Sequence, residues 1–196
     1  MKFSIFVFVL FLSASVFGFA GPQITSSTHP DGEVWSTNDS PRFEFEFDGA
    51  SGYSFVFDRF PDTIPDDVSD STDGEKVFLG KDNGQWFFHV IYRAGGQWSE
   101  ASHYGLKIDR FPPFAATALK ASPLGAGSIQ LTWNAGLDSH SGIKGYKIYR
   151  GLLTGFSIID EGATVISELT SGTSYVDEGV SEGVYYHYIL QSIDNA

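Results

Sequence analysis

The chain has 196 residues, a formal net charge of −12 and no cysteine. Its acidity argues against binding to nucleic acid, which needs clustered lysine and arginine side chains, and the sequence has no such cluster. The absence of cysteine excludes disulfide-stapled scaffolds, so a hydrophobic core or bound ions must hold the fold together.

Residues 1–20 have the pattern of a secretory signal peptide. Lys2 is followed by an apolar run over residues 3–12 and then by small residues up to Ala20. The apolar run is shorter than the roughly 20 residues that a membrane-spanning helix needs. We therefore expect a secreted or cell-surface protein with no membrane span apart from this leader, an uncleaved anchor being the alternative.

Four segments after the leader have the pattern of β-strands. Residues 42–47 alternate arginine or glutamate with phenylalanine, and residues 53–57 and 104–109 also alternate. Residues 85–93 are rich in the aromatic and β-branched side chains that suit a half-buried sheet. A period of two indicates strands with one buried face, and these segments predict a β-sandwich over residues 21–110.

Pro112 and Pro113 mark the predicted domain boundary. Proline lacks the backbone N–H group, so two prolines in succession end a central strand. We expect residues 111–113 to form an extended, fairly stiff linker. Strand patterns resume at residues 118–121, 128–133, 145–150, 173–177 and 185–193. Short strands with turn signals about every ten residues predict a second sandwich over residues 114–196, a closed barrel being the alternative.

The second segment, residues 113–196, resembles a fibronectin type III domain. The likeness rests on Trp133 in Ile-Gln-Leu-Thr-Trp-Asn, Tyr146 in Gly-Tyr-Lys-Ile-Tyr-Arg, and Tyr186 in a late aromatic alternation. The resemblance implies that Trp133 packs between the two sheets and that the hydroxyl of Tyr186 bonds back to a nearby backbone group. It also implies seven strands. Since residues 185–193 count as the sixth, we expect the last strand to be missing and the sequence to be a fragment.

The first segment, residues 21–109, resembles the immunoglobulin-like domains that precede such modules in microbial surface proteins. The marks are Ser-Ser-Thr-His-Pro from Ser26, Trp35, the aromatic segment around Trp86, and Lys-Ile-Asp before the two prolines. Trp86, like Trp133, is expected to fill a core. Both families are mainly scaffolds, and a fold alone fixes no activity.

The chain carries no recognisable catalytic motif. It has no Gly-x-Ser-x-Gly elbow, no His-Glu-x-x-His pair and no phosphate-binding glycine loop with lysine. The five histidines are scattered and form no closely spaced ligand pair, so we expect neither a catalytic site nor a zinc site in these residues.

An acidic segment is the candidate for metal binding. It contains Asp66, Asp67, Asp70 and Asp73. Calcium takes carboxylate and backbone oxygens as ligands, but the segment lacks the terminal glutamate of an EF-hand loop. A solvated surface loop is the alternative to a calcium site.

Two hypotheses for the function follow. The first is a non-catalytic secreted or cell-surface modular protein, whose sandwiches act as spacers or as adhesion modules for an extracellular protein or glycan. The alternative is the accessory, carbohydrate-binding head of a secreted hydrolase with its catalytic domain beyond Ala196. Trp35, Trp98 and Tyr92 are the candidates for stacking on sugar rings.

Overall fold

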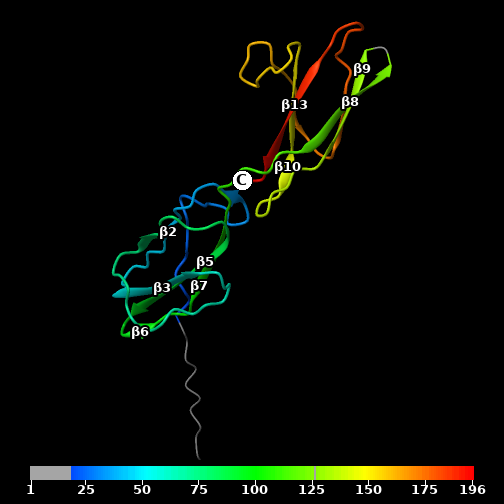
Figure 1. The fold of residues 1–196 in the computed structure, drawn as a ribbon. Helices are drawn as coiled ribbons and strands as arrows, with labels where there is room; N and C mark the ends of the chain where they lie inside the picture. The colour runs from blue at the N-terminus through cyan, green and yellow to red at the C-terminus, as the bar shows by residue number, and fades with distance from the viewer. Residues whose placement is uncertain (1–18, 126) are drawn as a thin grey trace, which may run out of the picture.

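The computed structural model describes residues 19–125 and 127–196, so residues 1–18 of the expected leader lie outside the described part. Over these two ranges the chain forms thirteen strands and no helix. The prediction of an all-β sandwich fold is confirmed. Figure 1 shows the strands in two lobes placed end to end. Over the same ranges the structure contains no helix with the length and apolarity to cross a membrane.

The first module packs a large sheet against a small one. The large sheet has the order β1-β7-β5-β3, with β6 paired to the end of β5, and the small sheet pairs β2 with β4. The strands of the large sheet are β1 (Trp35–Ser36), β3 (Gly52–Asp58), β5 (Gly84–Ala94), β6 (Gln97–Trp98) and β7 (Ser102–Ile108). The small sheet consists of β2 (Arg42–Glu44) and β4 (Glu75–Val77).

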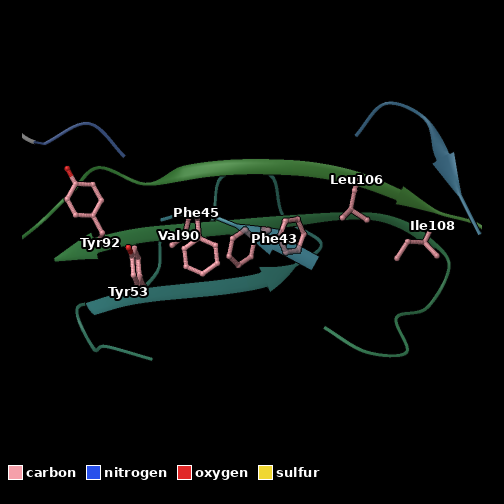
Figure 2. Packing of buried hydrophobic residues seen from close by; sticks show 8 residues of the cluster. Phe43, Phe45, Tyr53, Val90, Tyr92, Leu106 and Ile108 are labelled. Carbon is pink, nitrogen blue, oxygen red and sulfur yellow. The ribbon is translucent and has the colours of Figure 1, made fainter. Parts of the chain in front are cut away.

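Aromatic side chains form the core of this module. Alternation along the segment that begins with β2 turns Phe43 and Phe45 inward, and both are fully buried. Phe88 of β5 stacks on Phe43 with ring centroids 4.3 Å apart, and Figure 2 shows Phe43 and Phe45 beside the other buried side chains. Strand β2 ends at Glu44, three residues earlier than the alternation predicts, although the Phe45 N–H group still bonds to the carbonyl of Gly74, the residue before β4.

The second module has two three-stranded sheets, with the orders β12-β9-β8 and β11-β10-β13. Their strands are β8 (Thr117–Gly125), β9 (Ser128–Asn134), β10 (Ile143–Gly151), β11 (Thr164–Thr170), β12 (Ser174–Asp177) and β13 (His187–Asp194). Leu131 and Trp133 of β9 face Tyr146 and Ile148 of β10 in the core. Strand β13 lies at the edge of its sheet, and β10 is its partner among the described strands.

Candidate functional site at the junction of the modules

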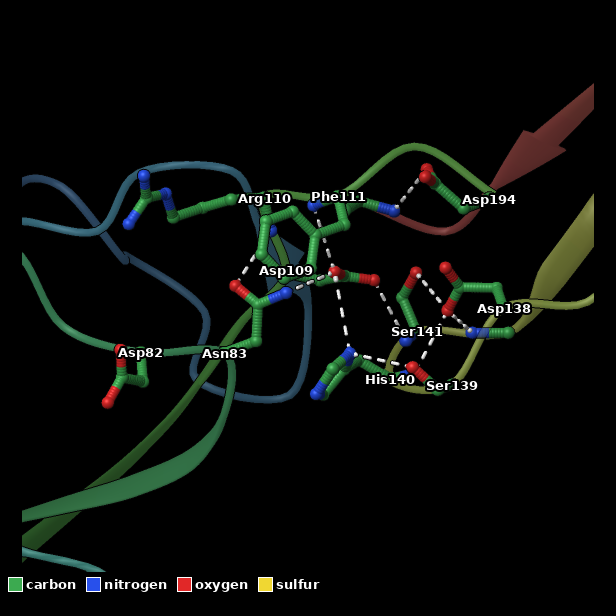
Figure 3. A network of polar contacts seen from close by, with 12 residues as sticks. Asp82, Asn83, Asp109, Arg110, Phe111, Asp138, Ser139, His140, Ser141 and Asp194 are labelled. Carbon is green, nitrogen blue, oxygen red and sulfur yellow. Dashed lines mark hydrogen bonds and ion pairs between the residues drawn. The ribbon is translucent and has the colours of Figure 1, made fainter. Parts of the chain in front are cut away.

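Asp109 lies where the first module ends, directly after β7, and its side chain is fully buried. Its Oδ1 atom accepts hydrogen bonds from Asn83 Nδ2 at 2.9 Å and from the Phe111 N–H group at 3.2 Å. Its Oδ2 atom accepts one from the Ser141 N–H group at 3.0 Å, across the junction (Figure 3). One buried carboxylate is therefore bonded by both modules.

The loop that carries Ser141 is held in shape by Asp138. The Oδ1 atom of Asp138 accepts hydrogen bonds from the N–H groups of His140 at 3.0 Å and Gly142 at 2.7 Å. Desolvation by burial raises the pKa of Asp138. Hydrogen bonds from the loop backbone together lower the pKa by more than burial raises it, so the net pKa lies below its ordinary value. Gly142 has φ +77°, a conformation that favours glycine. The loop therefore presents the Ser141 N–H group in a defined position.

The end of β13 supports the same loop. Asn195 Nδ2 donates hydrogen bonds to the Ser141 carbonyl at 2.8 Å and the Gly142 carbonyl at 3.1 Å. Figure 1 shows the carboxyl end of the chain beside the junction. Three segments far apart in sequence, around Asp109, Asp138 and Asn195, therefore meet there.

Asp109, Asp138 and Asp194 are the residues at the junction that could hold a metal ion. Each places one carboxylate oxygen within 4.8 Å of the other two. Such oxygens suit a hard cation such as calcium. Backbone and side-chain donors of the protein already bond to Asp109 and Asp138, and these hydrogen bonds by themselves explain where both carboxylates lie.

The acidic segment predicted as a calcium candidate lies elsewhere, along the edge of β3. Asp66 accepts a hydrogen bond from the Val68 N–H group at 3.0 Å, and Asp70 accepts one from the Phe55 N–H group at 2.8 Å. Asp66, Asp67, Asp70 and Asp73 are all exposed. Within the described ranges they do not form a group of three carboxylates as close as the one at the junction.

The predicted core residues divide into two kinds. Trp133 and Tyr146 are buried, and their rings meet edge to face with centroids 5.3 Å apart. Trp86 is partly exposed and packs against the first core, with its ring 5.0 Å from that of Phe57 and the Arg59 guanidinium 3.7 Å above it. Tyr186 is also partly exposed, and its hydroxyl accepts a hydrogen bond from the Ser181 N–H group at 3.0 Å.

The three aromatic residues considered for sugar stacking also differ in exposure. Tyr92 was a wrong choice, because it is 2% exposed and its ring stacks on Phe47 with centroids 3.9 Å apart. Trp35 and Trp98 are half-buried. Trp35 lines a pocket of about 320 Å³ together with Pro30 and Val34.

Comparisons with known proteins agree with the fold. No family model matches the chain. A stretch of 89 residues is 35% identical to Exoglucanase B of Cellulomonas fimi, which covers 45% of this chain and 7% of that enzyme. Domains A168–A170 of titin superpose with a TM-score of 0.58 at 13% identity, covering 89% of this chain and 61% of that one. The FN1–FN3 domains of chicken CNTN1 give a TM-score of 0.48 at 17% identity, covering 91% and 63%.

The topology and the similarity to the titin domains define the class of fold. The chain has the all-β sandwich fold of immunoglobulin-like and fibronectin type III domains. It spans 7% of Exoglucanase B and less than two thirds of either solved structure.

Proposed function

We propose that the chain is a non-catalytic spacer of a secreted or cell-surface modular protein, in which two sandwiches hold neighbouring parts at a set separation. The observation that carries the proposal is Asp109, a fully buried carboxylate that accepts hydrogen bonds from Asn83 in one module and Ser141 in the other. A fully flexible linker needs no such contact.

The strength of the Asp109 contact indicates how rigid the junction is. A hydrogen bond to a charged group contributes about 1.5–3 kcal/mol. A bent junction that lacks the bond from Ser141 is therefore roughly 10 to 150 times less populated than the closed junction. Pro112 and Pro113 restrict the linker further, since their φ angles are fixed. The two modules therefore move as one rod in this proposal.

Solution scattering tests the spacer. The measurement is the radius of gyration and the maximum dimension of the full chain compared with those of an Asp109→Ala variant. We expect the native chain to fit one extended arrangement of the modules, and the variant to require an ensemble of arrangements. Identical scattering from both proteins, with a broad ensemble needed for each, would remove the support for a spacer.

A second candidate function is supported by the similarity to Exoglucanase B. The matching stretch has about the length of one module and is a small part of that enzyme. Under this alternative, the modules are accessory parts of a secreted hydrolase and bind its polysaccharide. Retention of the chain on insoluble cellulose, lost in a Trp35→Ala variant, would favour this function. A chain that passes through cellulose as bovine serum albumin does would count against polysaccharide binding.

A further inference from the structure

His89 and His103 contact each other on the outer face of the large sheet. They are register partners on β5 and β7, and their Nδ1 atoms lie 2.6 Å apart. His89 is fully buried, whereas His103 is exposed. Two lone pairs would repel at this distance, and so would two N–H groups, so one proton must lie between the two nitrogens. The contact is therefore an N–H···N hydrogen bond.

The short distance also excludes a metal ion between these two nitrogens in this conformation. Zinc binds imidazole nitrogens at about 2.0–2.1 Å in a tetrahedral arrangement, which places two such nitrogens roughly 3.4 Å apart. The two Nδ1 atoms are closer to each other than that. A shared proton fits the contact, and a shared metal ion does not.

Asp58 sets which nitrogen of His89 carries the proton. His89 Nε2 is buried, makes no well-formed hydrogen bond, and lies 3.4 Å from Asp58 Oδ1. A lone pair at Nε2 would face the negative carboxylate, so the Nε2–H tautomer is favoured. Neutral His89 then has its lone pair at Nδ1 and accepts the proton of His103 Nδ1. Asp58, His89 and His103 thus form a chain from a partly buried carboxylate to solvent.

The segment after β3 is tied to the same carboxylate. Asp58 Oδ1 accepts a hydrogen bond from the Phe60 N–H group at 2.8 Å, and Asp58 Oδ2 accepts one from Thr63 Oγ1 at 2.7 Å. Asp66 Oδ1 accepts one from Ser54 Oγ of β3 at 3.3 Å. Residues 59–66 therefore lie against the strand next to His89.

The groups that act on His89 come from each neighbouring element. Desolvation lowers the pKa of His89 most, the Asp58 carboxylate on β3 raises it, and His103 on β7 lowers it. The segment after β3 contributes the backbone of Phe60, which also raises the pKa. The net pKa of His89 lies below its ordinary value, so His89 is neutral near pH 7.

We propose that Asp58, His89 and His103 form an acid-sensitive clasp that holds residues 59–66 on the large sheet. A proton on His103 Nε2 leaves the Nδ1–H···Nδ1 bond intact. A further proton on His89 Nδ1 sets two N–H groups against each other, so His89 is driven away from its place beside Asp58 and the segment is released. The clasp is independent of the junction and of the spacer function.

Nuclear magnetic resonance of the imidazole nitrogens tests the clasp in the full chain. We expect His89 to be the Nε2–H tautomer at neutral pH. In a His103→Gln variant the pKa of His89 should rise by about one unit or more, because the His103 Nδ1–H group no longer opposes a proton on His89 Nδ1. In Asp58→Asn it should fall. His187→Gln, in the second module, is the matched control and should leave the pKa of His89 unchanged.

Hydrogen exchange of the amides in residues 59–66 tests the release. After correction for the intrinsic exchange rate, acid should weaken the protection of these amides in the native chain. In His103→Gln the protection should remain in acid, because charged His89 still faces Asp58. Four results would overturn the proposal: an Nδ1–H tautomer of neutral His89, an unchanged pKa of His89 in His103→Gln, equal acid protection in both proteins, or added zinc bound by both Nδ1 atoms.

Discussion

At the scale of single residues, buried charged side chains are stabilised in two different ways. Asp177 is 3% exposed and accepts hydrogen bonds from Arg150 Nη1 at 2.9 Å, the Gly179 N–H group at 3.0 Å and Tyr188 Oη at 3.0 Å. Burial, followed by the hydrogen bond to Asp177, raises the pKa of Tyr188 well above its ordinary value. Asp109, in contrast, forms its hydrogen bonds with neutral donors, and the nearest ion-pair partner is His140 Nδ1 at 3.9 Å.

Replacement of Arg150 by methionine should destabilise the second module by about 3 kcal/mol, because it leaves the Asp177 carboxylate buried without its cation. Urea denaturation measures the change in the free energy of unfolding. The double variant Arg150→Met/Asp177→Leu should recover much of the loss, since neither charge is then buried. A double variant less stable than Arg150→Met would contradict this explanation.

His29 predicts a dependence of stability on pH. Its side chain is 2% exposed; desolvation lowers its pKa, and the hydrogen bond to the Asn38 carbonyl raises it less. The unfolded chain then binds more protons below about pH 6.5, so stability should fall as the pH drops through that range. Urea denaturation at pH 7 and pH 5 should show a smaller loss in His29→Gln than in the native chain. Equal losses would show that His29 does not contribute.

At the scale of elements, the sequence predicts most of the long strands, but it misses the seven-residue β11 and the short strands β1, β4 and β6. Strands β3, β5 and β9 follow the predicted segments closely, because burial of one face imposes a period of two. Strands β1 and β6 have two residues each and exist through their pairing with β7 and β5, so they carry no periodic signal.

The sites were harder to predict than the strands, because their residues meet only after folding. His89 and His103 are fourteen residues apart and contact each other through the register of β5 and β7. Asp109 ends the last predicted strand of the first module, but its partner Ser141 lies thirty-two residues further on, in the other module. Strand alternation and linker composition contain no information on either contact.

Gly32 tests the close packing of the turn before β1 on β7. A Cβ atom at this position would lie 1.9 Å from the Gly105 carbonyl oxygen, so Gly32→Ala must displace backbone. We expect a loss of about 2 kcal/mol, measured by thermal unfolding. Gly162→Ala is the matched control, since an added Cβ there meets nothing within 4 Å, and it should leave the melting temperature nearly unchanged. Equal effects of the two changes would contradict the packing argument.

At the scale of the whole molecule, two cores are joined by one polar junction. The first core is built from Phe43, Phe88 and their neighbours, and the second from Leu131, Trp133, Tyr146 and Ile148. Residues 109–115 separate the two cores, and Asp109 bonds to both sides. In the proposed spacer, each module has its own core and the junction sets the relative direction of the two modules.

The distance between spin labels in the two modules tests this account most directly. Since the chain has no cysteine, labels can be attached through Gln97→Cys on β6 and Thr132→Cys on β9, both exposed positions on strands. Double electron–electron resonance should give one narrow distance distribution, and adding Asp109→Ala should broaden it. A distribution that is equally broad with and without Asp109 would contradict the claim that this carboxylate fixes the two modules relative to each other.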